Sequence, residues 1–375
     1  MKILFTGGGT GGHVFPIIAI VREIRKIYPK DKLEFYHIGP KDNFSQMLLS
    51  QEDIKTKTIL AGKIRRYPGR ESFFQNALDL LFKIPLGTIQ AFFFIFFLSP
   101  DLIFSKGGYA SLPVIFANWI FEIPVFLHES DVAPGLGNKA SGKLAVEIFV
   151  SFPKTEYFAR ERMLAVGNPI RKEVLNGSRE RAKEIFKLTG EKPVILVLGG
   201  SQGAQKINDV LISILPEMLE SFEIIHQCGE GNFKQVETET KMVVKGELEK
   251  YYHLYAFLHE LELKHAYQAS DLIVSRAGAG SIFEIAALAK PSILIPLRIA
   301  AQNHQIKNAY AYAENGACLV MEEENLTPRF FLEKLKFLFS HPEELEKMVQ
   351  KTAEFAKPEA AQIIAKYIIE YLLKK

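Results

Sequence analysis

Two glycine-rich segments, each lying between a short apolar run and a helical stretch, constrain the fold of this chain more than any other feature. The first, residues 6–13, reads TGGGTGGH and follows the short run KILF at residues 2–5. The second, residues 198–204, reads LGGSQGA and follows the apolar run 194–198. A strand that passes through glycines into a helix opens a doubly wound α/β domain. The sequence therefore predicts two Rossmann-like domains.

The length and the apolar pattern agree with this interpretation. A chain of 375 residues exceeds the usual size of one domain. Its short β-branched and aromatic runs are apolar throughout, which is typical of parallel strands covered by helices on both faces, so the class is α/β. The predicted strands are residues 2–5, 33–38, 102–104, 125–128, 194–198, 224–227, 272–274 and 293–296.

A composition change near residue 167 indicates the boundary between the two domains. The segment GNPIR is followed by a charged stretch, and a new strand begins at residue 194. Apolar residues recur at helical spacing over residues 360–373, which predicts a last helix that packs back on the body. We expect an N-terminal domain over 1–165, a linker over 166–192, a C-terminal domain over 193–345 and the final helical segment over 346–375.

The charge balance excludes a general nucleic-acid binder. The chain has 46 basic and 43 acidic residues, a net charge of only +3. Two cysteines, Cys228 and Cys318, form no metal-binding or disulfide pattern and favour a reducing, cytoplasmic setting. The longest uncharged run, residues 84–100, is shorter than the ~20 apolar residues of a spanning helix, so no transmembrane helix is predicted.

The glycine segments are candidate anion-binding sites. Backbone N–H groups at a helix N-terminus attract phosphate, and small residues let a ligand approach closely. Two such segments predict two anionic ligands, or one ligand and an anionic acceptor. His13 ends the first segment, where it serves either as a general base or as a cation that contacts phosphate. Lys106, in a third cluster reading SKGGY, is either a point charge on phosphate or a solvated side chain.

Polar residues further along the chain suit a ligand rich in hydroxyl groups. Residues 275–287 read SRAGAGSIFEIAA, which predicts that Glu284 lies in the first turn of a helix. A carboxylate there either compensates the helix dipole or accepts hydrogen bonds from sugar hydroxyls. Amide and imidazole groups then gather after the strand at 293–296, at Gln302, Asn303, His304, Gln305 and Asn308.

A phenylalanine-rich segment accompanies a basic cluster near residue 70. Residues 91–98 are apolar on all sides, so a helix there is either buried in the core or partly immersed in the surface of an anionic membrane. The phenylalanines are Phe73, Phe74, Phe82, Phe92, Phe93, Phe94, Phe96 and Phe97, and the basic residues are Lys63, Arg65, Arg66 and Arg70.

Seven motifs, in the family's order and at compatible spacing, resemble the MurG family of glycosyltransferases. That family adds N-acetylglucosamine (GlcNAc) to the lipid-linked muramoyl-pentapeptide of bacterial peptidoglycan synthesis. The resemblance extends over nearly the whole chain. The motifs are GGTGGHVFP at 8–16, KGGY at 106–109, HE at 128–129 with PG at 134–135 and Asn138, GNPIR at 167–171, GGSQGA at 199–204, RAGA at 276–279 with EIA at 284–286, and HQ at 304–305 with NA at 308–309.

The resemblance implies a GT-B architecture, in which two Rossmann-like domains face a cleft. It implies UDP-GlcNAc on the C-terminal domain, the lipid-linked acceptor on the N-terminal domain, no cofactor or metal, and a peripheral position on the cytoplasmic face of the inner membrane. By similarity, the substrate-binding residues are Thr10, Gly11, Gly12, Asp131, Arg171, Ser201, Gln202, Leu258, Ala279, Gly280, Ser281, Ile282, Phe283, Glu284 and Gln305.

The resemblance implies that Arg171 and Leu258 contact the uridine and that Ser201 and residues 279–283 contact the diphosphate. It implies that Glu284 and Gln305 contact the hydroxyls of the ribose or of the sugar. The chain departs from the family's usual His-Glu-Gln-Asn at residues 128–131, where it reads HESD. Asp131 thus replaces an asparagine that contacts the donor. A carboxylate beside a diphosphate repels it unless the carboxylate faces a hydroxyl or a cation.

The expected reaction is an inverting transfer to the C4 hydroxyl of the acceptor, with His13 as the base and Glu129 in reserve. Another GT-B enzyme acting on a membrane glycolipid, or a non-catalytic nucleotide-sugar binding protein, would share the donor motifs. A nicotinamide-dependent oxidoreductase would explain the first glycine segment and leave the second unused.

Overall fold

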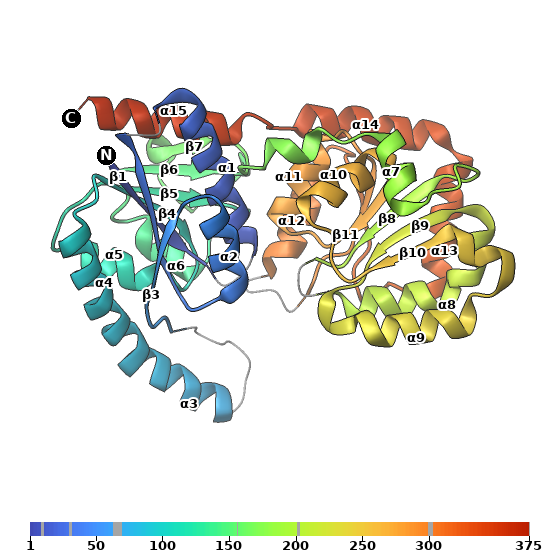
Figure 1. Ribbon diagram of the computed structural model, residues 1–375, viewed down its shortest axis with the longest axis horizontal. Helices are drawn as coiled ribbons and strands as arrows, with labels where there is room; N and C mark the ends of the chain where they lie inside the picture. The colour runs from blue at the N-terminus through green and yellow to red at the C-terminus, as the bar shows by residue number, and fades with distance from the viewer. Residues whose placement is uncertain are drawn as a thin grey trace. The chain divides into compact units, whose positions relative to one another are not determined.

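The chain folds into two compact α/β units. The computed structural model describes residues 1–8, 11–29, 32–62, 70–155, 157–200, 203–298 and 303–374. Unit 1 comprises Met1–Ile170 and Pro358–Lys375, and unit 2 comprises Arg171–Lys357 (Figure 1). The stretch 166–192, predicted as a linker, is therefore divided between the units. The segment 346–375 is divided too, because α14 (Pro342–Phe355) belongs to unit 2 and α15 (Ala360–Leu373) to unit 1.

Unit 1 contains a seven-stranded parallel sheet in the order β3-β2-β1-β4-β5-β6-β7. The apolar side chains of its central strands are buried on both faces, as the apolar runs predicted. The short strands β3, β6 and β7 were not predicted. The strands are β1 (Lys2–Gly7), β2 (Glu34–Gly39), β3 (Lys55–Thr58), β4 (Leu102–Gly107), β5 (Val125–Glu129), β6 (Glu147–Val150) and β7 (Met163–Ala165).

The helices of unit 1 include the last helix of the chain. Ile17 and Val21 of α1 and Ile364 and Ile368 of α15 are fully buried in one apolar cluster. The helices are α1 (Gly11–Ile27), α2 (Asn43–Gln51), α3 (Arg70–Leu78), the π-helical turn η2 (Asp79–Lys83), α4 (Ile84–Leu98), α5 (Leu112–Asn118), α6 (Leu136–Ser141), the 3₁₀ turn η3 (Arg160–Arg162) and α15.

Unit 2 contains a six-stranded parallel sheet in the order β10-β9-β8-β11-β12-β13. The strands are β8 (Val194–Leu198), β9 (Glu223–Gln227), β10 (Tyr252–Tyr255), β11 (Leu272–Ser275), β12 (Ser292–Leu294) and β13 (Leu319–Val320). The helices are η4 (Lys172–Leu175), α7 (Arg179–Phe186), α8 (Gln205–Ser221), η5 (Glu230–Asn232), α9 (Phe233–Val243), η6 (Gly246–Tyr251), α10 (Glu260–Ala269), α11 (Ala279–Ala287), α12 (His304–Ala313), α13 (Pro328–Ser340) and α14.

Both sheets reverse their strand order beside the strand that precedes a glycine segment. In unit 1, β1 lies between β2 and β4, and in unit 2, β8 lies between β9 and β11. The crevice at such a reversal, beyond the carboxyl ends of the strands, is where open α/β sheets bind ligands. The loops after β1 and β4, and those after β8 and β11, are therefore the candidate binding loops of the two units.

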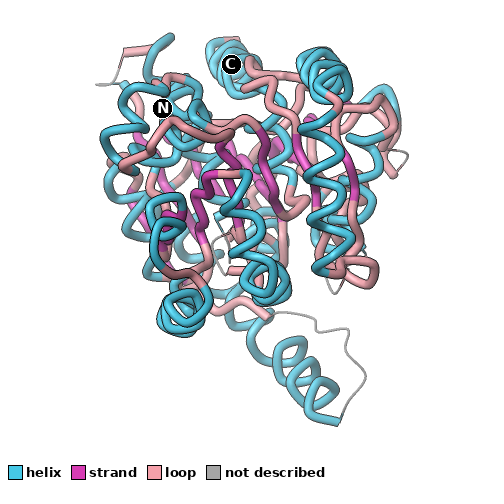
Figure 2. Tube along the Cα trace, turned by 90° about the vertical axis from the view of Figure 1, so that its right-hand side faces the viewer, coloured by secondary structure: helices cyan, strands magenta, loops and turns pink. Residues whose placement is uncertain are grey.

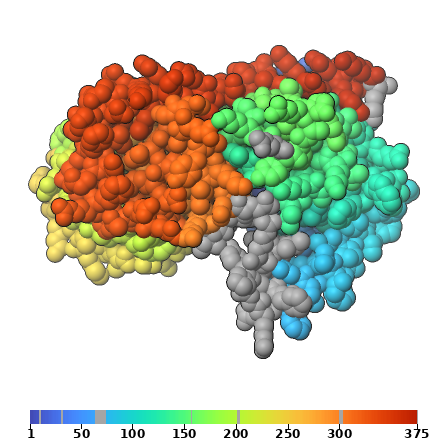
Figure 3. Space-filling view, turned by 180° about the vertical axis from the view of Figure 1, so that it is seen from behind, coloured from blue at the N-terminus to red at the C-terminus, as the bar shows by residue number. Residues whose placement is uncertain are grey.

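The phenylalanine-rich segment forms one long helix, of which a large part is exposed. α3, η2 and α4 are continuous, and the first part projects away from the sheet of unit 1 (Figure 1, Figure 2). The π-helical turn lies just before Pro85, whose ring would otherwise meet the carbonyl four residues back. Residues of this helix form part of the molecular surface, in light blue in Figure 3.

The structure bears on two predictions about this helix. Phe74–Leu98, 25 residues long, is long and apolar enough to cross a membrane by length and composition alone, and 22% of its 18-residue apolar window is buried. The sequence argument stopped at Lys83, which pairs with Asp79 at 2.5 Å inside the helix. The alternative of a fully buried core helix is wrong, because Phe93 and Phe97 are 53% and 78% exposed.

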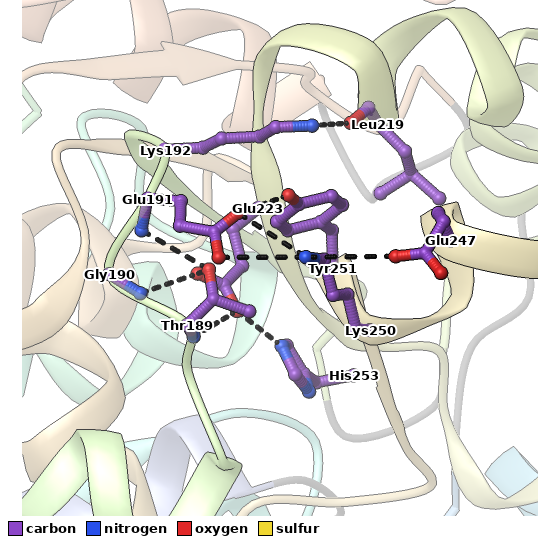
Figure 4. A network of polar contacts seen from close by, with 10 residues as sticks. All are labelled: Thr189, Gly190, Glu191, Lys192, Leu219, Glu223, Glu247, Lys250, Tyr251 and His253. Carbon is purple, nitrogen blue, oxygen red and sulfur yellow. Dashed lines mark hydrogen bonds and ion pairs between the residues drawn. The ribbon is translucent and has the colours of Figure 1, made fainter.

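A buried carboxylate fixes the start of the unit 2 sheet. Glu223, at the beginning of β9, accepts hydrogen bonds from Thr189 N (2.9 Å), Thr189 Oγ1 (3.1 Å), Gly190 N (3.4 Å) and His253 Nε2 (2.9 Å) (Figure 4). Burial alone would raise the pKa of Glu223, but the hydrogen bonds from His253 and Thr189 outweigh it, and the pKa lies below its usual value. The loop before β8 is thus tied to β9 and β10.

We expect Glu223→Gln to lower the free energy of unfolding by about 1–3 kcal/mol at neutral pH. Because the native pKa is depressed, the stabilisation is complete above the unfolded pKa of about 4.5 and is lost as the pH falls through the native value. Urea unfolding of wild type and variant between pH 3 and pH 7 measures the difference. The exposed Glu220→Gln is the control, and an equal difference at every pH would contradict the role of the carboxylate charge.

Candidate functional site

The start of α1 carries the N-terminal glycine motif of unit 1. Gly11, Gly12 and His13 are the first three residues of the helix, while Thr10 lies outside the described residues. His13 is partly exposed, and its ring lies against the loop after β4: a Cβ atom on Gly108 would be 3.0 Å from His13 Nε2. Gly108 also has a φ of +82°, which favours glycine. The loops after β1 and β4 therefore meet at His13.

Glu129 is held beside these loops by hydrogen bonds to both of its oxygens. It ends β5 and is 3% exposed. Its Oε2 accepts from Asn138 Nδ2 at 2.7 Å, and its Oε1 accepts from the backbone N–H of Asp131 at 2.9 Å. Asn138 Oδ1 in turn accepts from Gly108 N at 3.3 Å. A continuous series of contacts thus links the two residues predicted as the base and its reserve.

The electrostatic environment makes Glu129 titrate near neutrality. Burial, and next the negative charge of Asp131, raise the pKa of Glu129 to about 7, although hydrogen bonds and the Lys106 ammonium oppose the shift. Lys106 itself is 2% exposed, so its interpretation as a solvated side chain is wrong. Titratable groups with shifted pKa values in one crevice are typical of a functional site.

In unit 2, Arg171 and Glu284 form an ion pair. Arg171 Nη2 lies 3.3 Å from Glu284 Oε1, and Arg171 Nη1 lies 3.0 Å from Glu260 Oε2. Tyr267 donates to Glu284 Oε2 at 3.0 Å, and because burial and the Glu284 carboxylate raise the pKa of Tyr267, the phenol keeps its proton. Two residues predicted to bind one ligand therefore touch, and Glu260 and Tyr267 orient them.

The helix after β11 begins earlier than expected. α11 starts at Ala279, so Glu284 lies in the second turn and its prediction in the first turn is wrong. Compensation of the helix dipole therefore does not explain this carboxylate. Ile282 and Phe283 are 0% and 1% exposed, and both side chains belong to the core. A ligand at this end of the helix would meet the backbone of residues 279–281.

Gln227 joins the two loops that follow β8 and β10. Its Nε2 donates to Gly200 O at 3.2 Å, and its Oε1 accepts from Leu258 N at 3.1 Å. Leu258 is 2% exposed, so its side chain belongs to the core. Ser201 and Gln202, predicted to contact the donor, lie outside the described residues. Gln227 was not among the predicted site residues, although its place at the end of a predicted strand could have indicated it.

Gln305 stabilises another loop of unit 2. Its Oε1 accepts from Leu297 N at 3.0 Å, across the segment that follows β12. Asn308, one turn further along α12, donates to Ala277 O at 3.4 Å. Gln302 lies outside the described residues. The amide cluster thus positions backbone in the loops after β11 and β12, which lie at the same edge of the sheet.

The described part of the chain contains two groups of predicted site residues, one in each unit. Unit 1 brings together His13, Glu129 and Asp131, and unit 2 brings together Arg171 and Glu284. The first group offers a buried carboxylate, Glu129, whose pKa is raised to about 7, together with His13 at a helix N-terminus. The second offers a buried cation, a carboxylate and exposed backbone at the ends of parallel strands, which suits an anionic ligand that also carries hydroxyl groups.

Comparison with known proteins identifies the domains. The model of the glycosyltransferase family 28 N-terminal domain matches residues 3–150, and that of the family 28 C-terminal domain matches residues 194–364. Among solved structures, a crystal structure of MurG from Acinetobacter baumannii is 25% identical, with a TM-score of 0.73 over 98% of this chain and 99% of that chain. The UDP-GlcNAc 2-epimerase of Neisseria meningitidis, 15% identical with a TM-score of 0.66 over 99% of this chain and 100% of that chain, shares the fold.

Curated relatives match over nearly their full length. A Clostridium tetani protein named UDP-N-acetylglucosamine–N-acetylmuramyl-(pentapeptide) pyrophosphoryl-undecaprenol N-acetylglucosamine transferase is 37% identical over 94% of each chain. A Bacillus anthracis protein of the same name, numbered 2, is 36% identical over 98% of this chain and 99% of its own. The chain therefore belongs to glycosyltransferase family 28 and, within it, to the MurG family of N-acetylglucosamine transferases with the GT-B architecture.

Proposed function

We propose that this chain transfers GlcNAc from UDP-GlcNAc to the C4 hydroxyl of undecaprenyl-diphospho-muramoyl-pentapeptide in peptidoglycan synthesis. One observation carries the proposal: the relatives named for this reaction match across both units, 94% or more of the chain. The likeness therefore includes the binding loops of unit 1 as well as those of unit 2. A binding protein that shared only the donor domain would match over one unit alone.

We assign the UDP-GlcNAc donor to unit 2. The backbone around Gly200 and the N-terminus of α11 offer N–H groups to a diphosphate. Gln227 connects the Gly200 loop to Leu258 by two hydrogen bonds. Glu284 already accepts from Arg171 and Tyr267, and a carboxylate has about four lone-pair positions in total, so it can also accept from ligand hydroxyls.

We assign the acceptor diphosphate and the proton transfer to unit 1. Direct attack of the acceptor hydroxyl on the anomeric carbon forms the new glycosidic bond, breaks the bond to UDP and inverts the configuration. His13 is partly exposed at the edge of the crevice, whereas Glu129 is buried with both oxygens hydrogen-bonded. His13 can therefore reach a substrate hydroxyl and take its proton, while Glu129 positions the loops around it.

The function is tested by transfer of labelled GlcNAc from UDP-GlcNAc to a short-chain analogue of the lipid-linked muramoyl-pentapeptide. A diacylglycerol glycolipid acceptor is run in parallel. We expect product with the first acceptor alone. Product with the glycolipid alone would replace the proposed acceptor, and UDP-GlcNAc binding without product from either acceptor would favour a non-catalytic binding protein.

His13→Ala should lower kcat by about 10²–10⁴-fold and leave the KM for UDP-GlcNAc nearly unchanged, because it removes the base and leaves the donor site intact. Steady-state kinetics at saturating acceptor measure both constants. His341→Ala, in unit 2 between α13 and α14, is the matched control and should retain wild-type rates. Normal turnover by a folded His13 variant would exclude this residue as the base.

We propose that the exposed apolar side chains of unit 1 hold the protein at the cytoplasmic face of the inner membrane. These side chains gather on the α3–α4 helix and at the end of α5, and the two helices pack together. Of the basic cluster expected beside them, Lys63, Arg65 and Arg66 lie outside the described residues. The exposed apolar residues are Phe74, Leu78, Leu80, Leu81, Phe82, Leu86, Ile89, Phe93, Phe96, Phe97, Phe116, Trp119 and Ile120.

The double variant Phe93→Asp/Phe97→Asp should lose most of its binding to anionic vesicles, since two charges on this surface oppose contact with lipid. Vesicle co-sedimentation measures bound protein with phosphatidylglycerol and with phosphatidylcholine. Met242→Asp, exposed on α9 of unit 2, is the control and should bind as wild type does. Unchanged vesicle binding by the folded double variant would refute a membrane role for this surface.

A further inference from the structure

Lys106 is a buried lysine whose ammonium lies within the protein. It is 2% exposed, which is rare for lysine without a partner. Its Nζ donates to Ser130 Oγ, and Ser130 Oγ donates to Asn168 Oδ1 at 2.9 Å. The side chain therefore connects the end of β4 with the loops that follow β5 and β7. A residue so enclosed is poorly placed to contact a phosphate of the substrate directly.

The ammonium of Lys106 bonds to Ser130, which lies between two carboxylates, Glu129 and Asp131, on one short turn. Burial lowers the pKa of Lys106 to about 8, while the charges of Glu129 and Asp131 oppose that shift. Glu129 and Asp131 are two residues apart, and the N–H of Asp131 donates to Glu129 Oε1. Two adjacent carboxylates repel each other and any diphosphate nearby, unless a cation balances them.

We propose that Lys106 is a positioning residue for the transfer reaction, the counter-charge that allows Asp131 to replace the family's asparagine beside Glu129. The inference rests on the proposed function, because it assigns the turn 129–131 to the transfer machinery. The aspartate at position 131 adds a negative charge that would repel an anionic ligand. The buried ammonium of Lys106 compensates this charge.

The contacts around Lys106 extend its influence to the base. Gly107 and Gly108 follow directly, and a Cβ atom on Gly107 would lie 1.8 Å from Asn138 Oδ1, so the amide packs tightly on this backbone. Asn138 binds both Gly108 N and Glu129 Oε2, and His13 lies against Gly108. Without the ammonium, repulsion within the turn would disturb Glu129, then Asn138, and through the Gly108 loop the position of His13.

A double-mutant cycle tests the pairing, with Lys106→Met, Asp131→Asn and the double variant compared with wild type. We expect Lys106→Met to lower kcat about tenfold or more, with the KM for UDP-GlcNAc within about twofold because the donor site lies in unit 2. The double variant should be about 2–100-fold more active than the product of the single effects predicts. Thermal unfolding of the same four proteins gives the coupling in stability.

Each outcome decides the matter. Coupling in kcat supports the proposal, whereas additive effects on kcat, or coupling in thermal stability alone, overturn it. If Lys106→Met does not fold, the double variant should fold and turn over, and failure of both to fold would show that Lys106 does not balance Asp131. Lys143→Met, an exposed lysine of unit 1, is the control and should change neither constant. An inactive wild type would refute the proposed function itself, while an active wild type with an additive cycle refutes this inference alone.

Discussion

Both units depend on one constraint: every strand runs parallel to its neighbours. A parallel sheet requires a crossover after each strand, and the right-handed crossovers place helices on both faces. All carboxyl ends then meet at one edge, so residues far apart in sequence become neighbours there. The hydrogen bonds from Gly108 to Asn138 and from Asn138 to Glu129 form because their loops share this edge. Gln227 contacts two loops of unit 2 for the same reason.

The central part of the fold could be predicted from sequence because burial on both faces produces unbroken apolar runs. Every strand predicted in this way is present, with ends that differ by a few residues. Two of the missed strands carry no such signal, although the missed β6 reads EIFV. Lys55–Thr58 reads KTKT and lies at a sheet edge, and Leu319–Val320 has only two residues. The division of the chain at residue 170, and again before Pro358, depends on which core each helix joins, and a local pattern does not reveal that.

The site was predictable at the level of loops and less so at the level of contacts. Glycine segments and the family motifs located the ends of β1, β4, β8 and β11, and the structure brings His13 and Glu129 into one crevice there. The burial and the partners of individual side chains could not be predicted from the sequence. Lys106 was predicted to be solvated or to bind phosphate, and Ile282 and Phe283 were predicted to contact the ligand. Those properties follow from tertiary packing, which places a side chain toward the core or toward a partner.

The position of α15 has a consequence for how the protein is made. This helix covers part of α1, yet it is synthesised only after the whole of unit 2. At a synthesis rate of about 5–20 residues per second, the apolar face of α1 waits for roughly tens of seconds before its partner emerges. During that interval the nascent first unit exposes an apolar surface, while the second unit can already fold. Chaperone capture during translation is therefore expected at the first unit, although its sheet is synthesised first.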